Sequence, residues 1–277
     1  MEVNTCSSHP ILQPCGLEGF TYQLDPYKGC EHRCSYCYAL NQSETDWSRE
    51  IQTHQDFTFH LRSELFTLVP QTMYIGMNTD PYQPVEEEHR QTRQALELLV
   101  EHSFSACILT KSDLVVRDIE LLKRMKDSSA GISLAFQDEE VRRIFEPHAP
   151  PNEKRIEVLL KLKKAGVGSY ALICPVMPYL TDVEALIEVV APVADTIWIY
   201  PLRMESESDR NWQNVYALLK RCFPEIAEQY REVVFTYDHP YWLDLGCKLE
   251  DARLRGGLNL RVELGRQRSS ERAKGMR

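Results

Sequence analysis

The sequence lacks the features that would direct a chain into or across a membrane. The longest uncharged stretch, residues 165–181, is broken by Pro175 and Pro178. A spanning helix needs about 20 consecutive apolar residues, so none is expected. The first residues, MEVNTCSSHPILQ, contain neither the basic region nor the apolar core of a secretory signal. We therefore expect a cytoplasmic protein with no membrane partner.

The sequence also lacks an excess of positive charge. It holds 32 Lys and Arg against 41 Asp and Glu, a formal net charge of −9. Because binding to phosphate backbones requires clustered Lys and Arg, a general nucleic-acid binder is disfavoured. Only the C-terminus is basic, and residues 265–277 have little apolar surface to pack, so we expect a disordered tail there.

Repeats and low-complexity segments are absent, and short β-branched runs alternate with amphipathic stretches instead. Six strands separated by helices imply parallel pairing with right-handed crossovers. The polar segments after these strands would share one edge, which is the active face of a barrel. The pattern predicts an α/β fold, a partial (β/α)6 TIM-type barrel. The expected strands are 22–25, 72–77, 106–110, 131–136, 167–174 and 196–200, and the expected helices are 89–102, 115–126, 152–165 and 182–190.

Residues 1–200 are expected to form this barrel core, and residues 201–264 a C-terminal extension packed on it. Within the extension the sequence predicts helices over 209–222 and 248–255, and an extended segment over 233–237.

Cysteine is frequent, with nine residues in the chain. An odd number without an export signal does not indicate a disulfide framework. Three of the nine, Cys30, Cys34 and Cys37, lie within eight residues and could meet at one soft metal centre. A zinc site completed by His32 or a remote cysteine, a [4Fe–4S] cluster with one open iron, and three buried thiols all fit this spacing.

The sequence motifs around these cysteines resemble those of one known family. Cys-x3-Cys-x2-Cys, with Tyr36 just before the last cysteine, is similar to the signature of the radical S-adenosylmethionine (SAM) superfamily. Four blocks resemble its spore photoproduct lyase-like branch: DPYKGCEHRCSYCYA (25–39), TDPYQPVE (79–86), LTKSDLVVRD (109–118) and EPHAPPNEKR (146–155).

The resemblance implies a partial (β/α)6 barrel with a [4Fe–4S] cluster on Cys30, Cys34 and Cys37 and with SAM on the fourth iron. Reductive cleavage of SAM would give a 5′-deoxyadenosyl radical that abstracts hydrogen from a substrate. The electron would come from an external donor such as flavodoxin or ferredoxin. A metal-binding module without turnover is the alternative from another class.

The resemblance also assigns SAM contacts to residues at the predicted strand ends. Tyr36 would lie against adenine, a carboxylate such as Asp80 suits the SAM amino group, and an ammonium such as Lys111 suits its carboxylate or ribose. Instead of binding SAM, Asp80 could serve as a cap or turn residue, and Ser133 could be a small residue that fills the barrel interior. The full set of SAM-binding candidates is Tyr36, Thr79, Asp80, Lys111, Ser112 and Ser133.

One position departs from the pattern of the lyase itself. The lyase uses a cysteine on the second strand as hydrogen-atom donor, and the matching residue here is Met77, which has no S–H hydrogen. We therefore expect a small-molecule, amino-acid or peptide substrate, with repair or modification of a nucleic acid as the alternative. Cys174 and Tyr200, at the ends of the fifth and sixth strands, are the candidate hydrogen donors.

Overall fold

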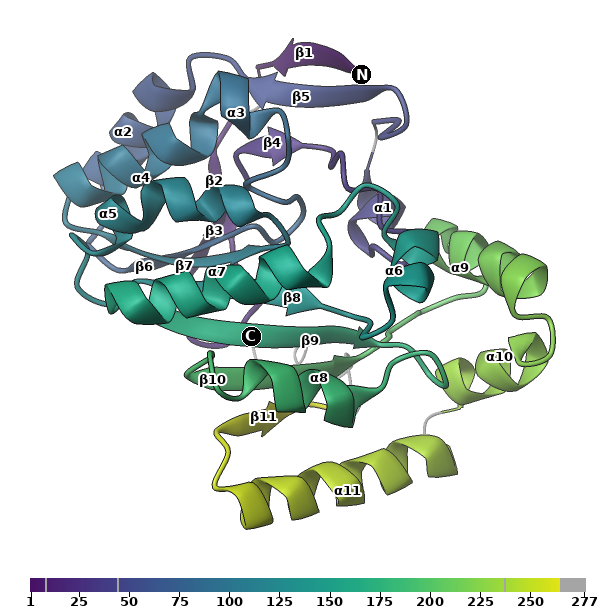
Figure 1. The fold of residues 1–277 in the computed structure, drawn as a ribbon. Helices are drawn as coiled ribbons and strands as arrows, with labels where there is room; N and C mark the ends of the chain where they lie inside the picture. The colour runs from purple at the N-terminus through teal and green to yellow at the C-terminus, as the bar shows by residue number, and fades with distance from the viewer. Residues whose placement is uncertain (8, 44, 237, 265–277) are drawn as a thin grey trace, which may run out of the picture.

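The computed structural model describes residues 1–264 except 8, 44 and 237, and the tail predicted over 265–277 lies outside this range. An eight-stranded sheet runs through the molecule in the order β11-β10-β9-β8-β7-β6-β3-β2 (Figure 1). Its six central strands are parallel, as predicted, and they form an open, partial barrel. They are β3 (Tyr22–Leu24), β6 (Thr72–Ile75), β7 (Ser105–Thr110), β8 (Ser129–Leu134), β9 (Gly168–Val176) and β10 (Thr196–Pro201).

Helices cover one face of this sheet (Figure 1). Side chains from the strands, such as Ile108 and Ile173, and from the helices, such as Leu159, are fully buried between the two layers. The predicted helix over 115–126 is instead the 3₁₀ helix η1 (Asp113–Asp118) followed by one short α-helix. The covering helices are α2 (Phe57–Phe66), α4 (Gln91–Glu101), α5 (Ile119–Leu122), α7 (Asn152–Ala165) and α8 (Val183–Val190).

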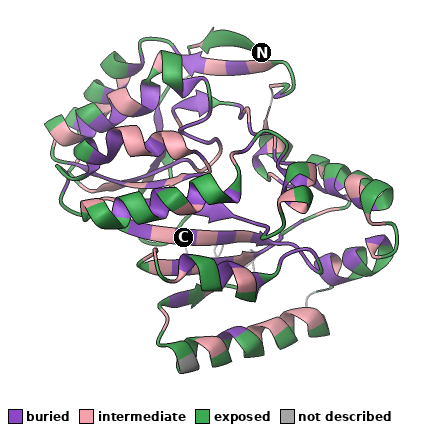
Figure 2. Cartoon of the chain, viewed as in Figure 1, coloured by how far each residue is buried: buried purple, intermediate pink, exposed green. Residues whose placement is uncertain are grey.

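The opposite, inner face of the sheet is more open. Along β9 and β10 the inward residues alternate with buried ones, as the two-residue period of a strand requires. Tyr170 crosses this face where β8 has Gly131, and a Cβ on Gly131 would lie 2.0 Å from Cε2 of the Tyr170 ring. Figure 2 shows the buried strands beneath the partly exposed helices.

A small second sheet joins distant parts of the N-terminal region and was not predicted. β5 (Glu50–His54) pairs in parallel with β1 (Glu2–Cys6) and antiparallel with β4 (Tyr27–Lys28). Because β4 ends just before Cys30, this sheet fixes the start of the three-cysteine loop. α1 (Ala39–Gln42) directly follows the cysteine loop in the chain. Two further short helices, α3 (Glu86–His89) and α6 (Glu139–Phe145), follow β6 and β8.

Short strands from the two ends of the chain extend the sheet. β2 (Leu12–Pro14), near the N-terminus, adds to one edge next to β3. The C-terminal part adds β11 (Leu260–Val262) to the other edge, next to β10. Three helices, α9 (Arg210–Cys222), α10 (Ala227–Phe235) and α11 (Pro240–Gly256), occupy most of this part. Trp212 and Tyr230 pack with Cys34 and Tyr36, so α9 and α10 close over the cysteine loop.

The extended segment predicted over 233–237 is wrong for its first residues, which end α10. Tyr230, Val233 and Val234 are buried at helical spacing, so packing against α9 outweighs the strand propensity of the valines. Within the described residues, no helix is both long enough and apolar enough to cross a membrane.

Candidate functional site

The three predicted cluster ligands lie in one loop, where burial disfavours the deprotonated form of each cysteine. Cys30 and Cys34 are buried, Cys37 is half-buried, and all three are free thiols. Burial raises the pKa of Cys30 and Cys37, and raises that of Cys34 to about 12. Bound iron reverses this preference because a cation stabilises the thiolate. A metal that binds here would therefore have to displace the protons of these buried thiols.

Among the described residues, the alternative zinc site completed by His32 is not assembled. In the described part of the chain, no three Cys, His, Asp or Glu side chains converge as ligands of one metal ion. His32, the predicted alternative ligand, instead has Nδ1 3.4 Å from Oδ2 of Asp80. In a [4Fe–4S] cluster, each of the three cysteines would bind a different iron of one cube.

The segment after β6 holds the start of the cysteine loop in place. The Gly29 carbonyl accepts hydrogen bonds from Thr79 Oγ1 and from Gln83 Nε2, the latter at 3.1 Å. Gln83 Oε1 accepts from the Glu31 amide at 2.8 Å, and Glu31 Oε2 accepts from the Val85 amide at 2.6 Å. Thr79 thus supports the loop, and its predicted contact with SAM stays a prediction.

Asp80 is engaged within the chain through both carboxylate oxygens. Oδ1 accepts from Thr110 Oγ1 at 2.5 Å and from the Tyr82 amide at 2.9 Å. Oδ2 accepts from the Lys111 amide at 2.7 Å and faces His32. Asp80 therefore positions the end of β7 whether or not it also contacts SAM.

Lys111 places a cation at the centre of the site. Its Nζ donates to Ser133 Oγ at 3.1 Å and lies 5.8 Å from the centroid of the Tyr36 ring. Among the described residues no carboxylate lies within 4 Å of this half-buried ammonium. Burial lowers the pKa of Lys111, but nearby Cys34 and Glu146 raise it above its usual value overall. The ammonium stays charged and can take an anion such as the SAM carboxylate.

Tyr36 is fixed by a buried ion pair that the sequence analysis left out of the site. Its hydroxyl donates to Glu146 Oε1, and Glu146 Oε2 accepts from Arg155 Nη2 at 2.5 Å. Glu146 and Arg155 are both fully buried. Arg155 Nη1 also donates to the Ser133 carbonyl at 3.0 Å. Both residues belong to the block 146–155 that resembles the family, and this membership was the sequence signal that could have identified the pair.

The structure places Ser112, a predicted SAM contact, and Cys174, a predicted hydrogen donor, in different surroundings. Ser112 Oγ accepts from the Leu114 amide at 3.2 Å and caps η1, which is a local structural role. Cys174 lies at the site: Ser133 Oγ donates to its carbonyl at 3.3 Å. Burial raises the pKa of Cys174 to about 11, although Lys111 and Arg203 lower it.

Tyr200 lies one strand away from Cys174. Ile199 pairs with Ile173, and the register of the two strands shifts between Ile199 and Pro201, where Tyr200 lies. The pKa of Tyr200 is raised by burial, by Glu263 and by Cys174, which is therefore near it. The structure therefore brings together Cys174, Lys111, Ser133 and Tyr36, and sets Tyr200 at their margin. Catalytic roles for Cys174 and Tyr200 stay predictions.

Comparisons with known proteins agree with this arrangement. An uncharacterised protein of Methanocaldococcus jannaschii is 28% identical over 213 residues, which cover 76% of this chain and 81% of that one. The fold is similar to a mutant of spore photoproduct lyase with bound SAM and a dinucleoside spore photoproduct, with a TM-score of 0.68, 12% identity and coverage of 95% and 82% of the two chains.

A second solved structure, SuiB of Streptococcus suis bound to its precursor peptide SuiA, has a TM-score of 0.58, 16% identity and coverage of 88% and 49%. The family model of the radical SAM superfamily matches residues 24–190, which include all three loop cysteines. The chain belongs to the radical SAM superfamily, whose enzymes use a [4Fe–4S] cluster and SAM.

Proposed function

We propose that this enzyme abstracts hydrogen from a small-molecule, amino-acid or peptide substrate bound on the inner face of the barrel. The observation that supports this most is the position of Lys111, an ammonium with no carboxylate partner among the described residues, between the cysteine loop and Cys174. With cluster and SAM bound, such a site supplies a 5′-deoxyadenosyl radical.

The chain's own groups would divide the work as follows. Cys30, Cys34 and Cys37 would each hold one iron, and Lys111 would donate hydrogen bonds to the SAM carboxylate. The Tyr36 ring would lie against adenine, held in orientation by Glu146.

Substrate would lie beyond SAM, near Cys174. A thiol gives up a hydrogen atom readily, so Cys174 could return hydrogen to a substrate radical after the first abstraction. Its raised pKa keeps the S–H bond intact at neutral pH, which this role requires. Tyr200, near Cys174, could take the same role for a substrate bound further out.

A single anaerobic experiment tests the proposal. The cluster is reconstituted, SAM and dithionite are added without substrate, and 5′-deoxyadenosine and methylthioadenosine are quantified, with Cys34→Ala as the control. Abundant 5′-deoxyadenosine that is absent from the control supports the proposed radical. Methylthioadenosine alone would contradict it, because SAM would then break at a different C–S bond.

A nucleobase substrate is the second candidate, and the inner face provides an observation in its favour. Trp198 and Tyr200 stack there with ring centroids 6.2 Å apart, and half-buried aromatic rings bind planar bases. The similar lyase structure contains a dinucleoside. Oligonucleotide binding that weakens with salt and with Trp198→Ala would favour this candidate, whereas the net charge of −9 and Met77 argue against it.

A further inference from the structure

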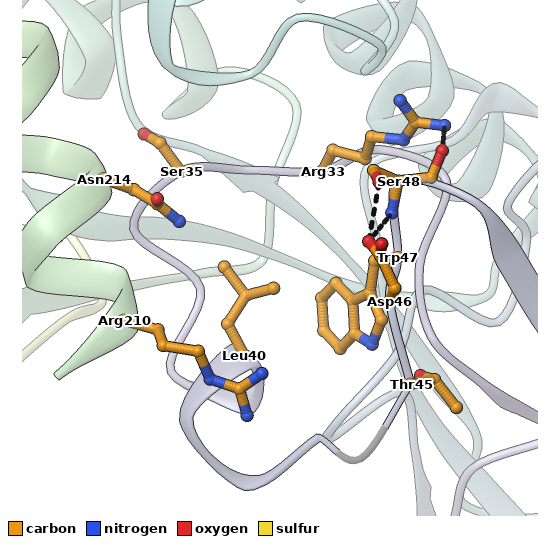
Figure 3. A pocket seen from close by; sticks show the side chains of 9 residues that line it. All are labelled: Arg33, Ser35, Leu40, Thr45, Asp46, Trp47, Ser48, Arg210 and Asn214. Carbon is orange, nitrogen blue, oxygen red and sulfur yellow. Dashed lines mark hydrogen bonds between the residues drawn. The ribbon is translucent and has the colours of Figure 1, made fainter.

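An open pocket of about 470 Å³ lies beside the cysteine loop (Figure 3). Both of its arginines are bound to carbonyls of the chain itself. Arg33 Nη2 donates to the Ser48 carbonyl at 3.0 Å, and Arg210 Nη2 donates to the Ser43 carbonyl at 2.5 Å. Arg33 therefore ties the middle of the loop to the segment before β5, whereas residues 79–86 hold its start.

A network of four charged side chains lies behind residues 79–86. The carboxylates of Glu86 in α3 and Asp118 in η1 are fully buried, and Arg117 joins them. Arg117 Nη2 donates to Glu86 Oε1 and, at 2.8 Å, to Asp118 Oδ2, and its Nε donates to Asp118 Oδ1 at 3.1 Å. Arg93 Nη1 donates to Asp118 Oδ1 at 2.5 Å. Two cations thus balance two buried carboxylates, and we call these four residues the charge network.

Tyr27 connects the charge network to the cysteine loop. It belongs to β4, three residues before Cys30, and is 1% exposed. Its hydroxyl donates to Glu86 Oε2 and accepts from the Gln91 amide at 3.1 Å. Burial and the adjacent Glu86 raise the pKa of Tyr27, so the hydroxyl keeps its proton and stays a donor. A displacement of Glu86 would therefore be passed to the strand that leads into the loop.

Tyr82 connects the same network to Asp80. Its hydroxyl donates to Asp118 Oδ2 at 3.2 Å, and the guanidinium carbon of Arg117 lies 5.9 Å from the centroid of its ring. The Tyr82 amide donates to Asp80 Oδ1 at 2.9 Å, and Asp80 Oδ2 accepts from the Lys111 amide at 2.7 Å. The residues assigned to SAM are thus linked through Tyr82 to the network that also holds the start of the loop.

The chemistry of the charge network favours a geometric role over a purely stabilising one. Taking ions out of water is costly, and well-packed apolar side chains of similar volume often give the same stability. Arg117 contributes direction instead, because its planar fork holds Glu86 and Asp118 relative to each other, which a single ammonium cannot do. Since these carboxylates hold Tyr27 and Tyr82, the fork sets how the loop and the end of β6 lie relative to each other.

We propose that Arg117 is a positioning residue that fixes Asp80 relative to the cysteine loop, and hence SAM relative to the cluster. The inference rests on the proposed function, in which SAM binds beside the loop at the end of β7. Arg117 acts through the two carboxylates of the charge network and the two tyrosines bound to them, and not by contact with SAM or the cluster.

The test disconnects each side of the charge network separately in the reconstituted holoenzyme. Tyr27→Phe removes the hydroxyl that leads to the loop, and Tyr82→Phe removes the one that leads to Asp80. Arg117→Lys keeps the charge and removes the fork. Tyr230→Phe is the matched control, because Tyr230 is also fully buried and its hydroxyl has no hydrogen-bond partner in the described part of the chain.

Each protein is compared with the wild type in iron content, melting temperature and equilibrium affinity for SAM. The electron paramagnetic resonance spectrum of the reduced cluster is recorded with and without SAM, and the difference between the two spectra reports how SAM meets the cluster. None of these measurements requires turnover. A network that only stabilises the fold would lower the melting temperature and leave the SAM affinity and this spectral difference unchanged.

We expect full iron content throughout. Arg117→Lys and Tyr82→Phe should weaken SAM binding about threefold or more, as expected for a lost hydrogen bond. Arg117→Lys and Tyr27→Phe should alter the spectral difference, and Tyr230→Phe should match the wild type. Wild-type SAM affinity and spectra in all three network variants would overturn the proposal, and so would an equal change in Tyr230→Phe. Lys111→Ala tests the proposed function separately: unchanged SAM affinity in that variant would contradict the proposed contact, while weakened binding in the network variants would still support the role of Arg117.

Discussion

Asp80 and Lys111 are joined through the backbone: Oδ2 of Asp80 accepts the Lys111 amide at 2.7 Å, which leaves the Lys111 side chain to turn toward Ser133. One residue therefore fixes the end of β7, and the other presents a charge to the site. The two roles predict different effects of mutation.

Lys111→Ala is expected to weaken SAM binding about tenfold or more, because a hydrogen bond to a charged group contributes roughly 1.5–3 kcal/mol. Lys111 has no carboxylate partner among the described residues, so the fold should tolerate the change. Equilibrium binding of SAM to the reconstituted protein measures the effect, with the exposed Lys154→Ala as control. Unchanged affinity would show that another group meets the SAM carboxylate.

Asp80→Asn is expected to reduce both SAM affinity and stability, since the amide cannot accept all the hydrogen bonds that the two oxygens now accept. Thermal unfolding and SAM titration of the same preparation distinguish this from Lys111→Ala, which should affect SAM affinity alone. A variant with wild-type melting temperature and weakened SAM binding would instead indicate direct contact of Asp80 with SAM.

Each of Cys30→Ala, Cys34→Ala and Cys37→Ala should abolish cluster binding, because each removes the thiolate for one iron. Iron and sulfide content and the absorbance of the reconstituted protein are the measurements. Cys222→Ala, which removes an exposed cysteine on α9, is the control and should retain a full cluster. Full cluster content in any loop variant would contradict the ligand assignment.

Glu146→Gln should destabilise the fold by roughly 3–5 kcal/mol, because it leaves the buried charge of Arg155 without a carboxylate partner. Arg155, Lys111 and the Tyr36 hydroxyl lower the pKa of Glu146 although burial opposes them. Its contribution is therefore present above the unfolded pKa of about 4.3 and is lost as the pH falls through the lower folded value. Denaturant unfolding between neutral and acid pH should give a shallower acid loss for Glu146→Gln than for the wild type; equal slopes would contradict this account.

Gly131→Ala should destabilise the barrel by about 1–3 kcal/mol, since its Cβ would overlap the Tyr170 ring. Gly16→Ala is the control, because nothing lies within 4 Å of a Cβ there. Urea unfolding measures both, and a Tyr170→Leu background should reduce the penalty. If Gly131→Ala unfolds like Gly16→Ala, the ring does not cover Gly131 in solution.

Local spacing was enough to predict the parallel strands, and the resemblance carried by the cysteine loop was enough to predict the superfamily, whereas the three cluster ligands stay a prediction. Hydrophobic periodicity is a property of neighbouring residues, and the helix over 152–165 therefore has the predicted bounds. The cysteine spacing is likewise contained in eight residues of one loop.

Only the tertiary structure decided what surrounds those elements. The β1–β5 pairing joins residues 2–6 to residues 50–54. The valines of α10, which were predicted to be extended, are helical because they pack against α9. Glu146 meets Tyr36 across 110 positions of the chain. Arg33 and Arg210 likewise approach the same pocket from the cysteine loop and α9. Such contacts depend on how layers pack, and no local period in the sequence encodes that packing.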